Sequence, residues 1–140
     1  MTTSLDTNVL IALWDASSGM TEAVSRACQH SRKRGPIVIC GPVFSELLGF
    51  PRRTSNEIHR RLEDEQISIE WEFFERDWQT AGLAYQGYVN RRRSSGGGLS
   101  RRMLTDFLIG AHASVRGHSL LTLDQGTYRA AFPNLRLQSF

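Results

Sequence analysis

The sequence predicts a single α/β domain over residues 1–140, in which a mostly parallel sheet of roughly four to five strands carries helices on both faces. Two observations predict this class. Short apolar runs that suit buried strands alternate along the chain with longer amphipathic stretches of helical period. In addition, no repeat of fixed period and no change of composition divides the 140 residues, a length typical of one domain.

The first strand and the first helix are expected within residues 3–14. Strand-compatible residues reach Asp6, and an apolar run of helical period follows at once over residues 9–14. The turn between them is so short that it leaves the Asp6 carboxylate at the carboxyl end of the strand. Thr7 and Asn8 are then placed to cap the helix. In an open α/β sheet, this edge is where ligands bind.

The central part of the chain continues the alternation of helix and strand. The pairs Gly35-Pro36 and Gly41-Pro42 mark a helix end and a helix start. The wholly apolar run between these pairs suits a strand that is buried on both faces. The expected elements are a helix at 21–34, a strand at 37–40, helices at 43–50 and 54–66, and a strand at 67–71.

The C-terminal part is expected to contain helices at 75–90 and 102–117, a buried strand at 119–123, a short helix within 124–132 and a candidate edge strand at 135–138. Residues 91–100 join three arginines to a Ser-Ser-Gly-Gly-Gly run, so we expect a mobile loop there. Gly110 and Ala113 share one face of their helix, so we expect that helix to approach the sheet closely. The aromatic residues of 71–88 lie at helical spacing, which is typical of core; a partner groove is the alternative.

Composition narrows the class of protein further. No run approaches the ~18 apolar residues of a membrane span, and the N-terminus lacks the layout of a signal peptide. Cys28 and Cys40 show neither a CxxC motif nor metal-ligand spacing, so we expect reduced core cysteines in a cytoplasmic protein. Of the 17 basic residues only Lys33 is a lysine, and many arginines stand in pairs or in a triple. Guanidinium groups suit phosphate contacts, although solubility is the simpler explanation of any single pair.

Four acidic residues are expected to meet at one edge of the sheet. Asp6 follows the first strand directly, and Asp124 follows the last buried strand just as directly. Glu46 lies about one turn into the helix after the second strand, and a right-handed crossover brings the start of that helix to the same edge. Asp106 lies near the start of the last long helix, which runs antiparallel to the sheet and so also begins there.

Such a group of carboxylates needs protonation or a cation, because two unit charges ~4 Å apart repel by roughly 4 kcal/mol at an effective dielectric of about 20. An all-oxygen acidic site suits Mg²⁺ or Mn²⁺, and such a site activates water in phosphodiester hydrolysis. Each acid also has a purely structural explanation: a helix cap for Asp6, a solvent-facing position for Glu46, a first-turn acid for Asp106 and a turn residue for Asp124. For these explanations to hold, four acids with unrelated structural roles would have to lie at the same sheet edge by coincidence.

The four acidic segments, taken together, resemble the motifs of PIN-domain ribonucleases, particularly the VapC-like toxins of bacterial toxin–antitoxin pairs. Leu-Asp-Thr-Asn-Val-Leu-Ile at 5–11 resembles the family's opening, and Ser45-Glu46-Leu47 resembles its second acidic position. The segments at 105–113 and 121–128 look like the third and fourth. Order and spacing match over essentially the whole chain. The Gly-rich run is not part of the common pattern, and the role of Gln125 is left open.

The resemblance implies a Mg²⁺- or Mn²⁺-dependent endoribonuclease. Its catalytic and metal-site residues would be Asp6, Glu46, Asp106 and Asp124, with Asn8 and Thr122 as supporting polar positions. The resemblance also implies a homodimer, and a small antitoxin whose C-terminal segment lies across the active-site groove. Of the nearby arginines, we expect Arg101 or Arg102 to hold the RNA backbone.

Other chemistries fit the sequence less well. The histidines are scattered, so a core or surface role is expected for each of His30, His59, His112 and His118. The glycines at 96–98 lack the preceding strand and the Gly-Lys-Ser/Thr ending of a P-loop. Aspartyl-phosphate chemistry uses a lysine at the site, whereas Lys33 lies at the far end of a helix. The remaining alternative is a catalytically inactive PIN-like module that binds RNA or protein, although such modules tend to lose acids that this chain retains.

Overall fold

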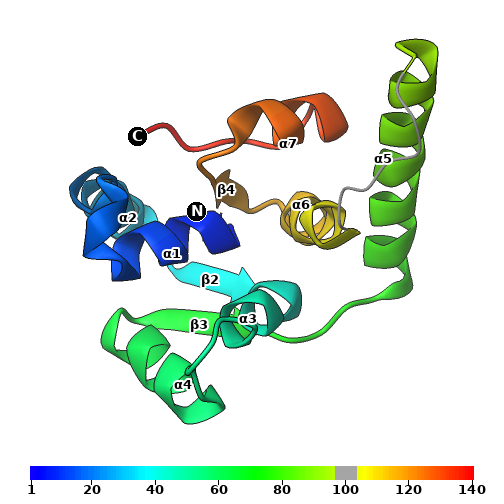
Figure 1. The fold of residues 1–140 in the computed structure, drawn as a ribbon. Coiled ribbons are helices and arrows are strands. Elements are labelled where there is room, and N and C mark those ends of the chain that lie inside the picture. Colours follow the sequence, from blue (N-terminus) through cyan, green and yellow to red (C-terminus); the bar gives the residue numbers. More distant parts are fainter. Residues whose placement is uncertain (97–103) are drawn as a thin grey trace.

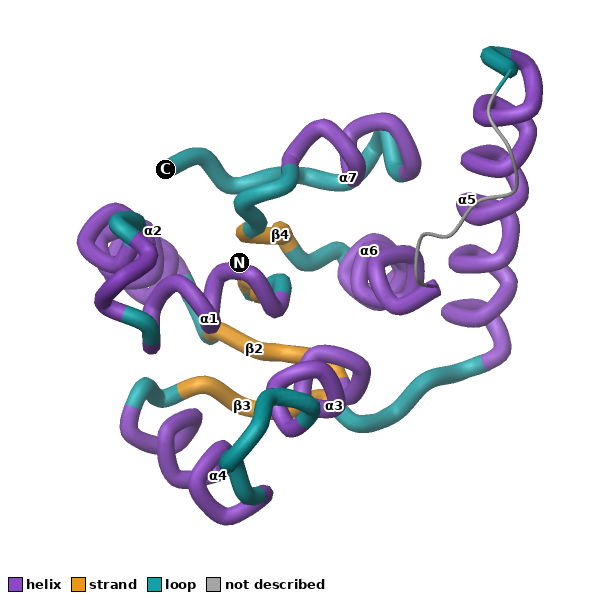
Figure 2. Tube along the Cα trace, in the orientation of Figure 1, coloured by secondary structure: helices purple, strands orange, loops and turns teal. Residues whose placement is uncertain are grey.

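A parallel sheet of four strands carries the fold in the computed structural model, which describes residues 1–96 and 104–140. The strands lie in the order β3-β2-β1-β4 (Figures 1 and 2). Their bounds are Thr3–Leu5 for β1, Ile37–Cys40 for β2, Ile67–Glu70 for β3 and Ser119–Leu121 for β4. The predicted α/β class is confirmed. The candidate edge strand at 135–138 contributes only an isolated parallel bridge between Leu120 and Leu137.

Helices lie on both sides of this sheet, as predicted. In Figure 1, α1 and α2 lie to one side of the strands and α6 lies to the other, with α5 outside α6. Within the described residues the helices are α1 (Thr7–Trp14), α2 (Thr21–Arg34), α3 (Gly41–Leu48), α4 (Ser55–Asp64), α5 (Glu75–Ser94), α6 (Leu104–Arg116) and α7 (Gln125–Ala131), with a short 3₁₀ turn, Ala16–Ser18, after α1. None of these helices is long and apolar enough to cross a bilayer.

Three of the four strands are buried because both faces of the sheet are covered; β2 is wholly apolar, whereas β1 and β4 also bury Thr3, Ser4 and Ser119. Every residue of β1, β2 and β4 is buried, whereas β3 at the edge of the sheet is only partly buried. This matches the continuous apolar run at Ile37–Cys40 and the alternating pattern of β3. Cys28 and Cys40 are free and buried, as expected for core cysteines.

The predicted loop at 91–100 is wrong at its start, because α5 continues to Ser94. Arginine is a good helix former, and cationic side chains in the last turn interact favourably with the helix dipole. The Ser95 hydroxyl closes the helix by donating to the carbonyl oxygens of Arg91 and Arg92, at 3.0 and 3.1 Å. The rest of the predicted loop, residues 97–100, lies outside the described residues.

A buried ion pair joins the start of α5 to the end of α6. Asp77 is fully buried; its carboxylate accepts from the Phe74 backbone N–H at 2.7 Å and from Arg116 Nη1 at 2.6 Å. Although burial alone would raise the pKa of Asp77, the hydrogen bonds from Arg116 and Phe74 hold it below its usual value. Together with the edge-on contact of Tyr85 and Phe107, whose ring centroids lie 5.3 Å apart, this pair fixes α5 against α6.

Gly110 on α6 allows a close approach by a side chain that the sequence did not single out. A Cβ atom at this position would lie only 2.2 Å from Cε2 of Phe132, which follows α7. The small residue therefore admits an aromatic ring from the C-terminal part of the chain, while the expected close approach of this helix to the sheet stays a prediction. Phe132 is itself buried, so its ring has little room to move.

We predict that Gly110→Ala lowers the free energy of unfolding by about 1–3 kcal/mol, because the added methyl group overlaps the Phe132 ring. Urea unfolding at neutral pH measures this change. Gly82→Ala is the matched control, since Gly82 lies in α5 with nothing within 4 Å of a Cβ atom; it should raise stability by roughly 0.5–1 kcal/mol. Equal effects of the two substitutions would contradict the close contact at Gly110.

Candidate functional site

The strand order places a crevice at the carboxyl edge of the sheet, between β1 and β4. From β1 the chain moves outward to β2 and then β3, and it returns to the other side of β1 to form β4. In parallel sheets, ligands bind at the carboxyl ends of the strands where the winding direction switches in this way. Asp6 directly follows β1, and Thr122 directly follows β4, so both residues lie at this switch point.

All four predicted acidic residues line one pocket of about 200 Å³ at this edge. Its lining residues are Asp6, Thr7, Asn8, Ile11, Glu46, Asp106 and Asp124. They come from α1, α3, α6 and the turn before α7, which are far apart in the sequence. The geometry therefore agrees with the expected meeting of these acids, while their roles in metal binding and catalysis stay predictions. Arg101 and Arg102 lie outside the described residues.

Asp6, and not Thr7 or Asn8, caps α1. One oxygen of its carboxylate accepts from the Thr7 backbone N–H at 2.7 Å, and the other accepts from the Thr122 hydroxyl at 2.8 Å. The expected capping by Thr7 and Asn8 is therefore wrong, because the turn after β1 is one residue shorter than a separate cap would need. Only 4% of Asp6 is exposed, so these hydrogen bonds satisfy a carboxylate that water hardly reaches.

Thr122 and Asn8 hold the two loops of the switch point together. The Thr122 hydroxyl, which donates to Asp6, also accepts from the Asp124 backbone N–H at 3.0 Å. The Asn8 side-chain carbonyl accepts from the Leu123 backbone N–H at 3.1 Å, and the Asn8 amide donates to Thr122 Oγ1 at 3.4 Å. The start of α1 and the end of β4 are thus joined through side chains, which fixes Asp6 and Asp124 relative to each other.

Two threonines that the sequence did not link to the acids orient Glu46 and Asp124. The Thr7 hydroxyl donates to Glu46 Oε1 at 2.5 Å, and the Thr127 hydroxyl donates to Asp124 Oδ2 at 2.8 Å. Thr127 stands three residues after Asp124, the spacing of one helical turn, and that spacing was the available signal. No local signal links Thr7 to Glu46, because they are 39 residues apart and meet only through the crossover between β1 and β2.

Burial and like charge make ionised Asp6 costly. Burial raises the pKa of Asp6 to about 6, and the nearby carboxylate of Asp106 raises it as well, although hydrogen bonds such as that from Thr122 act in the opposite direction. Tyr128, which the sequence did not mark, is buried beside the same acids; burial and the charges of Asp6 and Asp106 raise the pKa of its hydroxyl. Both shifts show that a negative charge is disfavoured at these two positions.

The donor set of the pocket fits a hard divalent cation. Its acidic side chains supply only oxygen atoms, the ligands that Mg²⁺ and Mn²⁺ prefer. Among the residues that the structure describes, no three His, Cys, Asp or Glu side chains form a ready-made metal cage. Mg²⁺ usually retains several waters and takes only one or two carboxylates directly.

The histidines named in the sequence analysis do not line this pocket. His112 is fully buried, with its ring centroid 5.2 Å from that of Phe73, and burial lowers its pKa to about 4. His118 Nε2 lies 2.8 Å from a carboxylate oxygen of Glu70. His112 is therefore a core residue, one of the two roles expected for it. Gln125, whose role was open, donates to the Gln138 carbonyl at 2.9 Å.

Comparison with known proteins identifies one family. The model of the PIN domain matches residues 4–133 of this chain. None of the curated proteins compared with the chain gives a significant match. Solved structures do match it along nearly its whole length, at low sequence identity.

Three of these structures show the breadth of the likeness. VapBC2 from Rickettsia felis, bound to a DNA fragment from its promoter, has a chain with 19% identity and a TM-score of 0.70; the match covers 99% of this chain and 98% of that one. VapBC-1 from nontypeable Haemophilus influenzae gives 18% identity, a TM-score of 0.68 and coverage of 99% and 98%. FitAcB from Neisseria gonorrhoeae gives 17% identity and a TM-score of 0.61; the match covers 98% of this chain and 96% of that one. At these identities the likeness shows the fold alone.

We predict that Asp6→Asn stabilises the metal-free protein at pH 7.5 by about 1–3 kcal/mol, since each pKa unit of the shift is worth roughly 1.4 kcal/mol. The pKa of Asp6 is raised in the folded state, so the wild type loses stability as the pH rises from about 4 to about 6. The gain from the substitution should therefore shrink as the pH falls below 6.

Urea unfolding in a chelator, at pH 7.5 and at acidic pH, measures this difference. Asp64→Asn, at an exposed position at the end of α4, is the control and should change stability little at either pH. If Asp6→Asn proves less stable than the wild type at pH 7.5, then burial and like charge do not dominate at Asp6.

Proposed function

The chain belongs to the PIN-domain family, and from this premise we propose that it is a metal-dependent endoribonuclease, the toxin of a bacterial toxin–antitoxin pair. One observation carries the proposal: four carboxylates from four separate segments line a single pocket at the switch point of the sheet. A structural role for each acid alone would not bring the four together. The names of the similar VapBC structures agree with the VapC-like motifs of the sequence.

In this proposal Asp6, Asp106 and Asp124 hold Mg²⁺ or Mn²⁺, and Glu46 completes the site directly or through water. When bound, such a cation lowers the pKa of water and stabilises the leaving oxygen of a phosphodiester. The protein's own residues set the geometry. Thr122 and the helix cap fix Asp6, while the Thr7 and Thr127 hydroxyls fix Glu46 and Asp124. These hydrogen bonds keep the acids in place before any cation or RNA arrives.

Arginines supply the phosphate contacts in this proposal. Arg101 and Arg102 stand five and four residues before Asp106 in the sequence, and we propose that they hold the RNA backbone near the pocket. A cytoplasmic location follows from the same proposal, because the substrate is cellular RNA.

Two protein partners complete the proposal: a second copy of the chain and an antitoxin whose C-terminal segment lies across the acidic groove. Three aromatic residues that were expected to belong to the core, Trp71, Phe74 and Trp78, are more than half exposed, at 54%, 59% and 53%. Such a surface suits a homodimer contact. Sedimentation equilibrium of the chain alone tests for the dimer, and a monomer at micromolar concentration would contradict it.

The alternative function is a PIN-like module that binds RNA or protein without cutting. The retained acids argue against it, because a binding module has no need to bury a carboxylate at a cost to stability, as Asp6 is buried here. Cleavage assays separate the two functions directly.

We predict that the wild type cuts members of a panel of structured and unstructured RNAs in Mn²⁺ and loses this activity in a chelator. Asp6→Asn should lower the cleavage rate by more than the ~10–100-fold that loss of an outer-shell partner costs. Because this variant is expected to be more stable than the wild type, unfolding cannot explain its inactivity. Asp64→Asn is the control and should cut normally. Mn²⁺ should also raise the melting temperature of the wild type.

Two results would overturn this proposal. Cleavage that persists unchanged in the chelator would exclude the metal-dependent mechanism. A wild type that cuts no RNA in the panel, and whose melting temperature ignores Mn²⁺, would favour the binding module.

A further inference from the structure

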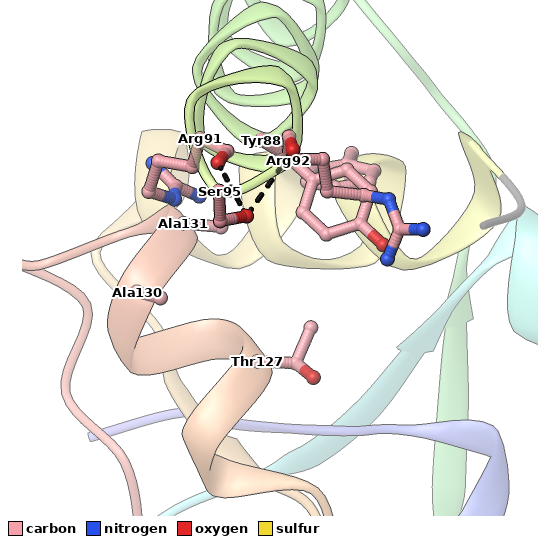
Figure 3. A pocket seen from close by; sticks show the side chains of 8 residues that line it. Tyr88, Arg91, Arg92, Ser95, Thr127, Ala130 and Ala131 are labelled. Carbon is pink, nitrogen blue, oxygen red and sulfur yellow. Dashed lines mark hydrogen bonds between the residues drawn. The ribbon is translucent and has the colours of Figure 1, made fainter. Parts of the chain in front are cut away.

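A second pocket, of about 220 Å³, lies between the end of α5, the start of α6 and α7 (Figure 3). It is lined by Tyr88, Arg91, Arg92, Ser95, Phe107, Thr127, Ala130 and Ala131. None of these residues lines the acidic pocket. The inference drawn from this second pocket rests on the proposed ribonuclease function and specifies where the enzyme holds one base of its substrate.

The second pocket adjoins the acidic one through two residues. Thr127 lines the second pocket, and its hydroxyl donates to Asp124 of the acidic pocket at 2.8 Å. Phe107 lines the second pocket and directly follows Asp106, which lines the acidic pocket. A chain molecule that places one bond at the acidic pocket therefore places its neighbouring units within reach of the second.

The walls of the second pocket suit a flat ring. The Tyr88 ring forms one side, and the Phe107 ring, which is only 1% exposed, packs against it, with centroids 5.6 Å apart and planes inclined by 48°. The Arg92 guanidinium stacks over Tyr88, 5.9 Å from its ring centroid, and the methyl groups of Ala130 and Ala131 face the same space. A volume of about 220 Å³ is smaller than the ~300–1,000 Å³ of pockets for drug-sized ligands, which favours a single small ring system.

The charge of the second pocket is opposite to that of the acidic pocket. Arg91 and Arg92 bring two guanidinium groups to its rim. Gly87, one turn before Arg91 in α5, leaves room for this side chain to lie back along the helix, since a Cβ atom there would stand 3.3 Å from Arg91 Nη1. Within the lining residues there is no acid to neutralise these charges. A ligand with an anionic group beside an aromatic ring matches both features.

We propose that this pocket binds an unpaired base of the RNA next to the bond that is cut, while Arg91 and Arg92 hold the adjoining phosphates. Sequence-dependent RNA recognition relies on unstacked bases that pack against aromatic rings or guanidinium planes. A base inside a duplex cannot leave its stack to enter such a pocket without loss of pairing. In this proposal, Tyr88 and Arg92 pack against the base beside the cleavage point.

The test uses the inactive Asp6→Asn protein and fluorescein-labelled RNA of about six nucleotides, in a chelator, with fluorescence anisotropy as the readout. Arg91→Ala and Arg92→Ala remove charge at the pocket, whereas Arg93→Ala removes the same charge from the same helical turn without touching the pocket. We expect each pocket substitution to weaken binding about 5–50-fold, and Arg93→Ala to weaken it by no more than about twofold.

A second pair of variants tests the pocket without changing charge. Ala130→Trp fills the space, and Gln29→Trp adds the same ring at an exposed position on α2. Ala130→Trp should lower the affinity for single-stranded RNA about tenfold, while Gln29→Trp should not change it. If Ala130→Trp does not fold by circular dichroism, Tyr88→Leu removes the stacking surface and replaces it in the test. Duplex RNA of the same length should bind the parent protein more weakly than the single strand.

The outcomes separate this proposal from the nuclease function. Equal losses for Arg91→Ala and Arg93→Ala, together with no effect of Ala130→Trp, would overturn the pocket proposal even if the wild type cuts RNA. Binding that depends on the pocket, in a wild type that cuts no RNA, would support the pocket proposal while the nuclease function fails. A protein that neither binds nor cuts single-stranded RNA overturns both.

Discussion

The burial of a single carboxylate, that of Asp6, is the constraint on which the site depends. Strand β1 lies between β2 and β4, so a residue that follows it directly cannot avoid the interior of the sheet edge. Only 4% of Asp6 is exposed, and its charge is disfavoured by burial and by Asp106. Hydrogen bonds from Thr7 and Thr122 make this position tolerable. The same bonds also tie the start of α1 to the loop after β4.

The hydrogen bonds of the site have a second effect, because they fix the positions of acids that come from different parts of the chain. Asp6 and Asp124 follow different strands, yet the Thr122 hydroxyl contacts both of them, through the Asp6 carboxylate and the Asp124 backbone N–H. Glu46 is fixed through Thr7, the residue after Asp6. Three of the four acids, Asp6, Glu46 and Asp124, are therefore held in position relative to the short turn after β1. The fourth, Asp106, comes from α6, whose far end is fixed to α5 by the Asp77–Arg116 pair.

The sequence predicted the parts of the site that depend on strand ends and chain order, and missed those that depend on tertiary contact. Asp6 was recognisable because β1 ends directly before it, and Asp124 because an apolar run ends at Leu123, although β4 itself ends two residues earlier, at Leu121. The Thr7–Glu46 bond and the position of Tyr128 were not, because no local pattern records which side chains a crossover brings together. The α5 boundary was missed because arginines that suit a loop also suit the last turn of a helix.

The two pockets answer a difficulty that an acidic nuclease site creates. A pocket lined by four carboxylates repels the phosphates of its own substrate, and even with one divalent cation its net charge stays negative when all four are ionised. Affinity for RNA must then come from positive groups that lie outside the pocket but at a fixed distance from it. The end of α5 meets this need, because Arg91 and Arg92 border the second pocket. Thr127 also lines that pocket, and its hydroxyl donates to Asp124 of the acidic pocket. In the proposed function, the acidic pocket cuts the RNA and the second pocket binds it. The first turn of α7, which carries Thr127, fixes the position of one pocket relative to the other.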